Sequence, residues 1–172
     1  MLTEVNIYTP ITRYHRKHSQ SEHQKVFKMQ GYPHYYVATA SGTSEGTVAV
    51  TGEGLPELET ASPPQFDGPL GVWSPETLFS ASVADCYILT FRAIARASKF
   101  EWNSLECKVE GVLERPERTT YFTTFNVHAV LHAPEGAKVE LAERLLEKAE
   151  SLCLITASLK SDVVLTTEII LD

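Results

Sequence analysis

The sequence is poor in cysteine and has no long uninterrupted apolar run. Three cysteines, a small and odd number, do not make a disulfide framework, which indicates thiols that are reduced at rest. The N-terminus MLTEVNIYTPITRYHRKHSQ has no apolar core behind a basic start, so no secretory signal is expected. Asp85 and Arg92 interrupt the most apolar segment, so no membrane span is expected. These absences predict a cytoplasmic protein.

Positively charged residues are also fewer than negatively charged ones. The chain has 15 Lys and Arg against 22 Asp and Glu, a net charge of −7, which argues against nonspecific binding to nucleic acid or to anionic lipid. No glycine-rich phosphate loop and no internal repeat occurs. The length of 172 residues suits a single domain with one core.

Residues 1–33 differ from the rest by their polarity. The stretch RYHRKHSQSEHQKVFK holds five Lys or Arg residues and three of the six histidines, His15, His18 and His23. Their spacings match no usual pattern of metal ligands, and no cysteine or paired carboxylate joins them. We therefore expect a polar arm over 1–33, solvated or contacting a partner, followed by one domain over 34–172.

The first part of that domain combines short strands with a long helix. YYVATASG and GTVAVTG predict two strands joined by a turn at residues 42–46, and LPELETA is a third candidate. Ser74 is a good N-cap, Pro75 suits the first helical position, and Glu76 complements the helix dipole. The helix should run to about Lys99 and is apolar nearly all round.

The second part alternates with a period of two, then returns to helix and strand. LECKVEGVL and TTFNVHAVLH predict two strands, KVELAERLLEKAESLC an amphipathic helix, and SDVVLTTEIIL a last strand, which gives an α+β order. Cys107 falls on the buried side, where inert packing is expected, and His128 and His132 on the exposed side, where we expect no chemistry. The inward positions are Leu105, Cys107, Val109, Gly111 and Leu113 on one strand and Phe125, Val127, Ala129 and Leu131 on the next.

Two other cysteines are candidates for chemistry. Cys86 lies in the long helix, twelve residues after Ser74 and therefore beyond the reach of the helix dipole. Its helical neighbours are mostly apolar, which raises a thiol pKa, so a reactive Cys86 needs a cation from elsewhere in the fold. Cys153 follows the last turn of the second helix, where the negative end of the dipole disfavours a thiolate and suits a resolving thiol. Inert packing is the alternative for both.

The segments ATASGTSEGTVAV, SPETLFSASVADCYILTF and KAESLCLITASLKSDVVLTTEI resemble the OsmC/Ohr family over residues 35–172. Glu76 and Cys86 keep the family's ten-residue interval, and Cys153 stands where the second family cysteine ends a helix. Leu154 occupies the place of a proline that often follows. The resemblance implies an OsmC/Ohr-like α+β fold with antiparallel strands around a long buried central helix. It also implies an intertwined homodimer with active sites at the subunit interface.

The activity that this resemblance implies is the reduction of organic or hydrogen peroxides. Cys86 would attack as a thiolate and become a sulfenic acid, and Cys153 would then close a disulfide that an external dithiol, of lipoyl type or another thiol, reopens. Glu76 would orient an activating arginine, and no bound cofactor or metal is implied. Asp85, beside Cys86, forms a stripe with Arg92 and Arg96 on α-helical spacing, and we expect these residues to serve in structural or interface ion pairs rather than in catalysis.

The family arginine is missing from its usual positions. Ser44 and Gln65 stand where a cation is expected, and the candidates to replace it are Arg13 and Arg16 in the arm and Arg115 and Arg118 in the ERPERT turn. Two alternatives to a peroxidase therefore stay open. One is a noncatalytic dimeric scaffold or small-molecule binder, and the other is a redox sensor that uses the same disulfide without turnover.

Overall fold

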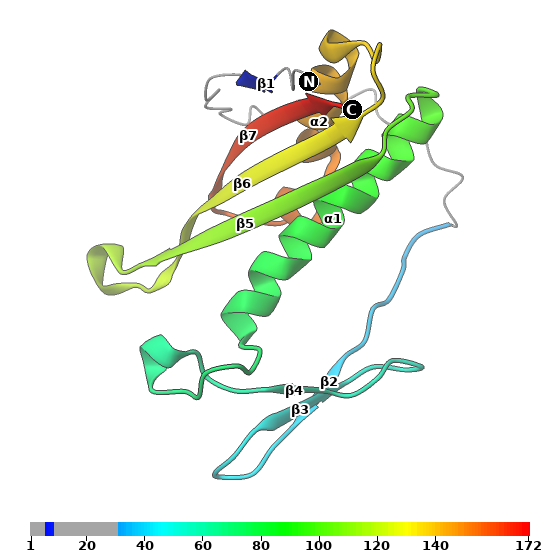
Figure 1. The fold of residues 1–172 in the computed structure, drawn as a ribbon. Helices are drawn as coiled ribbons and strands as arrows, with labels where there is room; N and C mark the ends of the chain where they lie inside the picture. The colour runs from blue at the N-terminus through cyan, green and yellow to red at the C-terminus, as the bar shows by residue number, and fades with distance from the viewer. Residues whose placement is uncertain (1–5, 9–30) are drawn as a thin grey trace. The chain divides into compact units, whose positions relative to one another are not determined.

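The structure is a computed structural model that describes residues 6–8 and 31–172. Within the described part, the chain forms two compact units that meet in sequence between Phe79 and Ser80, inside the long helix. Strand β1 belongs to the larger unit, which also contains residues 80–172. The elements are β1 (Asn6–Tyr8), β2 (Thr39–Ser41), β3 (Val48–Thr51), β4 (Leu58–Thr60), α1 (Pro75–Ala97), β5 (Ser104–Glu114), β6 (Tyr121–Ala133), α2 (Val139–Leu152), α3 (Leu154–Ala157) and β7 (Asp162–Leu171), with short 3-10 turns at Pro64–Phe66 and Pro116–Arg118 (Figure 1).

The smaller unit is built on a three-stranded antiparallel sheet in the order β2-β3-β4. The three strands predicted from the sequence are present, although each is only three or four residues long. The turn between β2 and β3 contains Gly46 at a φ of 91°, a conformation that costs glycine little because it has no Cβ.

The start of α1 is fixed by a reciprocal cap. The backbone N–H of Thr77 donates to Ser74 Oγ at 3.2 Å, and the N–H of Ser74 donates to Thr77 Oγ1 at 2.9 Å. Pro75 occupies the first helical position, which needs no N–H partner. The N-cap predicted at Ser74 is therefore confirmed, with Thr77 as the partner that closes the box.

The end of α1 has the hydrogen bonds of a Schellman motif. The N–H of Phe100 donates to the carbonyl of Ala95 at 2.9 Å, and the N–H of Lys99 donates to that of Arg96 at 3.1 Å. Lys99 consequently adopts a left-handed conformation with a φ of 52°. This turn ends the helix at Ala97, two residues before the predicted end.

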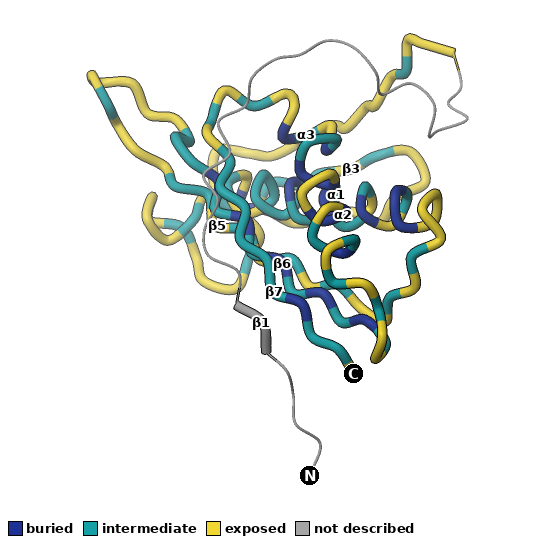
Figure 2. The backbone as a smooth tube through the Cα atoms, turned by 90° about the horizontal axis from the view of Figure 1, so that it is seen from above, coloured by how far each residue is buried: buried dark blue, intermediate teal, exposed yellow. Residues whose placement is uncertain are grey.

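The larger unit contains a four-stranded sheet in the order β1-β7-β6-β5. Its pairs are antiparallel except β6 with β7, which run parallel. The expectation of antiparallel strands fails for that pair because α2 and α3 carry the chain from the end of β6 back to the start of β7, and such a crossover joins parallel strands. Figures 1 and 2 show α1 and α2 on the same face of this sheet.

Strand β6, which faces the helices, confirms the predicted alternation of buried and exposed side chains. Phe125, Val127, Ala129 and Leu131 are buried, and the positions between them are partly exposed. Leu113 on β5 was predicted to face inward but is 37% exposed. The pairing register of β5 with β6 shifts just before this residue, which turns the end of the strand over.

Gly111 permits a close approach between β5 and α1. A Cβ at this position would lie 2.9 Å from Ser80 Oγ and 2.9 Å from Phe122 Cε1, both too close for real atoms. The strand can therefore pass beneath this part of the helix only because residue 111 has no side chain.

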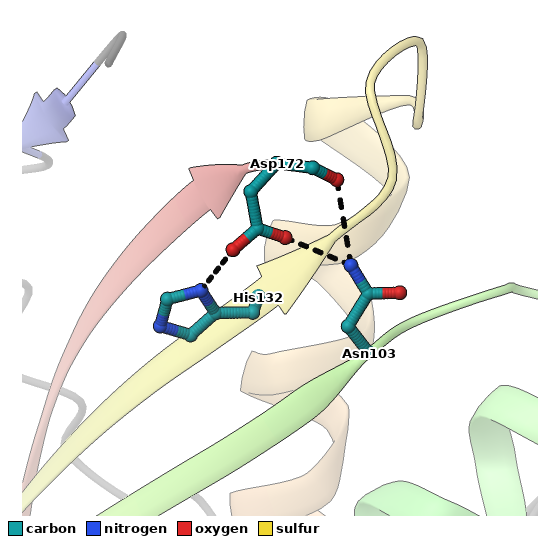
Figure 3. Close-up of polar contacts among 3 residues, drawn as sticks. All are labelled: Asn103, His132 and Asp172. Atoms are coloured by element: carbon teal, nitrogen blue, oxygen red, sulfur yellow. Dashed lines mark hydrogen bonds and ion pairs between the residues drawn. The ribbon is translucent and has the colours of Figure 1, made fainter.

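On the outer face of the sheet, a polar cluster joins three strand ends (Figure 3). His132 Nδ1 donates to the carboxylate of Asp172 at 2.6 Å, and Asn103 Nδ2 donates to the same carboxylate at 2.8 Å. These hydrogen bonds lower the pKa of Asp172, with that from His132 contributing most. His128 bonds Thr166 at 2.9 Å on the same face. These contacts account for both histidines as structural residues.

Helix α1 buries one stripe and leaves other apolar residues in contact with solvent. Its buried residues are Val83, Tyr87, Phe91, Ile94 and Ala95, whereas Leu89 is 49% exposed. By length and composition alone, α1 is the one helix among the described residues that is long and apolar enough to cross a membrane. We expected Asp85 and Arg92 to exclude a membrane span. By length and hydropathy they do not, because two charged residues leave the mean hydropathy of the helix high.

Candidate active site

Cys86 and Cys153 meet in the larger unit although sixty-seven residues separate them in sequence. Cys86 lies in the middle of α1 and is partly exposed, whereas Cys153 is completely buried between α2 and α3. The two thiols are hydrogen-bonded to each other, and neither takes part in a disulfide. The fold thus places two reduced sulfurs side by side.

Two features hold these cysteines opposite each other. Tyr87, the residue after Cys86, is buried, and its hydroxyl donates to the backbone carbonyl of Leu146 at 3.1 Å. Cys153 lies at the break between α2 and α3, with a φ of −63° and a ψ of 119°. Because this extended residue interrupts the helix, the chain changes direction next to the Cys86 sulfur.

The pKa of Cys86 is lowered from 9.0 to about 6. The largest cause is the hydrogen bond from the Cys153 thiol; burial opposes it, and the backbone N–H groups of Ile155 and Leu154 and the Thr90 hydroxyl lower the pKa further. Thr90 Oγ1 lies 4.0 Å from the sulfur. Burial against the apolar helix face does raise this pKa, as expected, but the donors at Cys153, in α3 and at Thr90 outweigh it, and none of them is the cation that the sequence led us to expect.

The pKa of Cys153 is raised above the range of an ordinary thiol. The main cause is its hydrogen bond with Cys86, in which Cys153 keeps the proton, and burial adds to the effect. The predicted direction is therefore found, but the position of Cys153 at a helix end is not among its causes. The proton between the two sulfurs stays on Cys153, which leaves Cys86 as the more nucleophilic thiol of the pair.

The other residues singled out in the sequence lie in different parts of the chain. Glu76 is half-buried in the first turn of α1, within the smaller unit, and its role stays a prediction. Arg13 and Arg16 lie outside the described residues. Arg115 and Arg118 are exposed in the turn between β5 and β6. Among the described residues, no cation contributes to the pKa of Cys86.

Cys107 lies apart from this chemistry. It is half-buried on β5, and burial raises its pKa to about 12, as suits a packing residue. The described residues also hold no cluster of three or more His, Cys, Asp or Glu side chains able to bind a metal ion. The candidate site therefore consists of one thiol pair and the donors around it.

The backbone donors of Leu154 and Ile155 were not expected from the sequence. Every residue except proline carries a backbone N–H, so the residue types give no signal for such a contact. The break in the helix at Cys153, which follows a continuous amphipathic pattern, was the feature that could have revealed them. Only the position of α3 against Cys86 shows where these groups point.

Comparison with known proteins supplies the family. A model of the OsmC-like protein family matches residues 68–168. An uncharacterized protein of Bacillus subtilis, YmaD, is 27% identical over 138 residues, which are 78% of this chain and 92% of that protein. An OsmC-like protein of unknown function from Vibrio cholerae superposes with a TM-score of 0.69 at 19% identity, covering 80% of this chain and 99% of the other.

A second solved structure is that of a protein named for hydroperoxide resistance. The organic hydroperoxide resistance protein OsmC of Legionella pneumophila is 26% identical, with a TM-score of 0.59 over 81% of this chain and 98% of that one. The family match covers more than half of the sequence and includes both cysteines of the thiol pair. Sequence pattern, fold and comparisons agree, and the chain belongs to the OsmC-like protein family.

Proposed function

We propose that this protein is a thiol-dependent peroxidase that reduces organic (or hydrogen) peroxides through Cys86 and Cys153. One observation carries the proposal: the two thiols are hydrogen-bonded, with the pKa of Cys86 lowered and that of Cys153 raised. Thiolate is the nucleophilic form of cysteine, so Cys86 is the residue prepared to attack. The hydroperoxide resistance protein of Legionella pneumophila supports the choice of substrate class.

The reaction needs only these two sulfurs and an external dithiol. The Cys86 thiolate attacks the terminal peroxide oxygen, an S–O bond forms, the O–O bond breaks, and the alkoxide leaves and takes up a proton to become an alcohol. The Cys153 sulfur then attacks the sulfur of the Cys86 sulfenic acid. A disulfide forms and the hydroxyl group leaves with the Cys153 proton as water. A dithiol reduces the disulfide by exchange and is itself oxidised.

We further propose that the protein acts as a homodimer. Large apolar side chains are exposed on both units when one chain is considered alone, including Leu89 on α1 and Leu70 and Trp73 just before this helix, which are 85% and 49% exposed. A patch of exposed apolar side chains often marks an interface with another protein. A second copy would cover it, and this reading accounts for the apolar character of α1 without a membrane. A cytoplasmic location, where thiols stay reduced, suits this chemistry.

The test uses matched serine substitutions of the three cysteines. The parent protein and Cys107→Ser should consume an alkyl hydroperoxide in the presence of a dithiol, whereas Cys86→Ser should lose all turnover. Cys153→Ser should form a sulfenic acid on Cys86, trapped by a dimedone reagent, without a disulfide. In the parent, one equivalent of peroxide should remove two hydrogens from the mass of the denatured chain.

Other outcomes would support different functions. Turnover of Cys86→Ser equal to that of the parent would exclude the proposed nucleophile. A disulfide that forms with one equivalent of peroxide but is not turned over with any dithiol would indicate a redox sensor. Thiols that react no faster than free cysteine would indicate a noncatalytic scaffold or binder, although the lowered pKa of Cys86 argues against this reading.

A further inference from the structure

We propose that the Thr90 hydroxyl binds the oxygen that Cys86 takes from a hydroperoxide, first as the terminal oxygen of the substrate and then as the oxygen of the sulfenic acid. The inference adds a catalytic residue on α1, and it rests on the proposed function for the class of substrate. It leaves the covalent steps of that reaction as they are, because Thr90 contributes only hydrogen bonds.

Thr90 lies one helical turn after Cys86, with its hydroxyl close to the sulfur. Residues four apart share a face of a helix, and a helical side chain leans toward the N-terminus, so Thr90 leans over the turn that carries Cys86. Thr90 Oγ1 lies 4.0 Å from Cys86 Sγ. Within the part of the chain that the structure describes, this sulfur is the hydrogen-bond partner of the hydroxyl.

A hydroxyl inside a helix ordinarily has a different partner. Ser and Thr side chains tend to donate to the backbone carbonyl one turn earlier. Ser158 follows this rule, since its Oγ donates to the carbonyl of Leu154 at 2.9 Å. The partner of Thr90 is instead the side chain of the residue four positions earlier. The hydroxyl is therefore turned toward the atom that reacts.

The separation of the two atoms suits an added oxygen better than a direct bond. A hydrogen bond between two oxygens is about 2.7–2.8 Å long, whereas a hydroxyl 4.0 Å from a sulfur makes only a weak contact. When an oxygen bonds to the sulfur on the side of Thr90, it lies closer to the hydroxyl than the sulfur does. We therefore expect a stronger hydrogen bond to the added oxygen than to the thiolate.

A threonine hydroxyl has the groups that both oxygens need. It carries one donor and two acceptor lone pairs, so it can accept from the O–H of a hydroperoxide and donate to the oxygen of a sulfenic acid. Its β-branched side chain has few rotamers in a helix, which holds the hydroxyl in place before the substrate arrives. Cys86 and Thr90 are both partly exposed, so a small substrate can reach the sulfur and the hydroxyl together.

Thr90→Val tests the inference, because valine keeps the shape of the side chain and removes the hydroxyl. Oxidation by an alkyl hydroperoxide and alkylation by iodoacetamide are each followed by mass spectrometry of the Cys86 peptide. Both are measured at about pH 8, where Cys86, with a pKa of about 6, is a thiolate. Loss of one hydrogen bond to the oxygen should slow the hydroperoxide reaction about tenfold and leave the iodoacetamide reaction unchanged.

Three further variants control the comparison. Thr90→Ser keeps the hydroxyl and should recover most of the rate with hydroperoxide. Thr90→Ala also lacks the hydroxyl and carries the residue best suited to a helix, so the result does not depend on the folding of the valine variant alone. Ser158→Ala removes a hydroxyl that bonds a backbone carbonyl, and it should react with both reagents as the parent does.

The outcomes separate this inference from the proposed function. Parent-like rates with hydroperoxide in Thr90→Val and Thr90→Ala would overturn the inference and leave the peroxidase unaffected. An equal loss with both reagents would also overturn it, because the hydroxyl would then act on the thiolate alone. A parent that reacts with hydroperoxide no faster than free cysteine would contradict the proposed function, and the ratio of the two rates would still decide the role of Thr90.

Discussion

The hydroxyl of Tyr87 donates a hydrogen bond to the carbonyl of Leu146 at 3.1 Å, and this bond joins the helix of Cys86 to the helix that leads to Cys153. Tyr87 is almost completely buried, and burial raises its pKa further above 10.0. The hydroxyl therefore stays protonated and acts as a donor at any physiological pH. Because Tyr87 follows Cys86 directly, its hydrogen bond to Leu146 helps to fix the distance between the two thiols.

Tyr87→Phe should keep the fold and slow the closure of the disulfide. The Leu146 carbonyl lies inside α2 and keeps its helical partner, so the loss is one hydrogen bond worth about 1 kcal/mol of unfolding free energy. Sulfenic acid on Cys86 should persist longer after one equivalent of peroxide, as followed by dimedone trapping in stopped-flow samples. Tyr121→Phe, on an exposed tyrosine of β6, is the control. An unchanged lifetime would show that the bond is only structural.

Cys153 should control the reactivity of Cys86 before any oxidation occurs. Its hydrogen bond is the largest cause of the lowered pKa of Cys86. Cys153→Ala removes the donor and should move the alkylation midpoint of Cys86 upward from about 6 by roughly one to two units. Cys153→Ser keeps a donor and should stay nearer the parent. Equal midpoints in Cys153→Ala and the parent would refute this assignment.

Cys107 should make the fold sensitive to alkaline pH. Burial raises its pKa from 9.0 to about 12, so the folded state favours the protonated thiol. Its contribution to stability is complete below pH 9 and is lost as the pH rises from about 9 toward 12. The free energy of unfolding in urea should therefore fall more steeply over this range in the parent than in Cys107→Ala.

This comparison has an internal control. Tyr87 and Cys153, whose pKa values are also raised, are present in both proteins, so their effects cancel in the difference. The substitution itself leaves a small cavity, but this offset does not depend on pH. Parallel pH profiles for the two proteins would mean that Cys107 reaches solvent in the native state.

Lys99→Gly should stabilise the protein. Lys99 has a φ of 52° in the Schellman motif that ends α1, and a left-handed conformation strains any residue that has a Cβ. Relief of this strain exceeds the entropy that glycine adds to the unfolded chain, so we expect a gain of about 0.5–1 kcal/mol in urea unfolding. Ala97→Gly, in the last helical residue, should instead destabilise by up to about 1 kcal/mol. The same sign in both variants would contradict this account.

The sequence by itself determined the elements and their inward faces. Ser74 marked the start of α1 because a hydroxyl before Pro75 suits an N-cap, and the period of two placed Phe125 and Val127 inward on β6. Such signals are local, since they depend on neighbours within a few residues. The inward position predicted for Leu113 was wrong because the pairing register shifts before it, and such a shift depends on the partner strand β6.

Only the tertiary structure decided which chemistry surrounds Cys86. Its own helix gives an apolar neighbourhood, and the sequence therefore predicted a raised pKa or a need for arginine. The fold brings α2 and α3 against that helix, and the donors that act are a thiol and two backbone N–H groups. Backbone donors are present at every residue except proline, so their effect depends on where the chain turns and cannot be read from residue type.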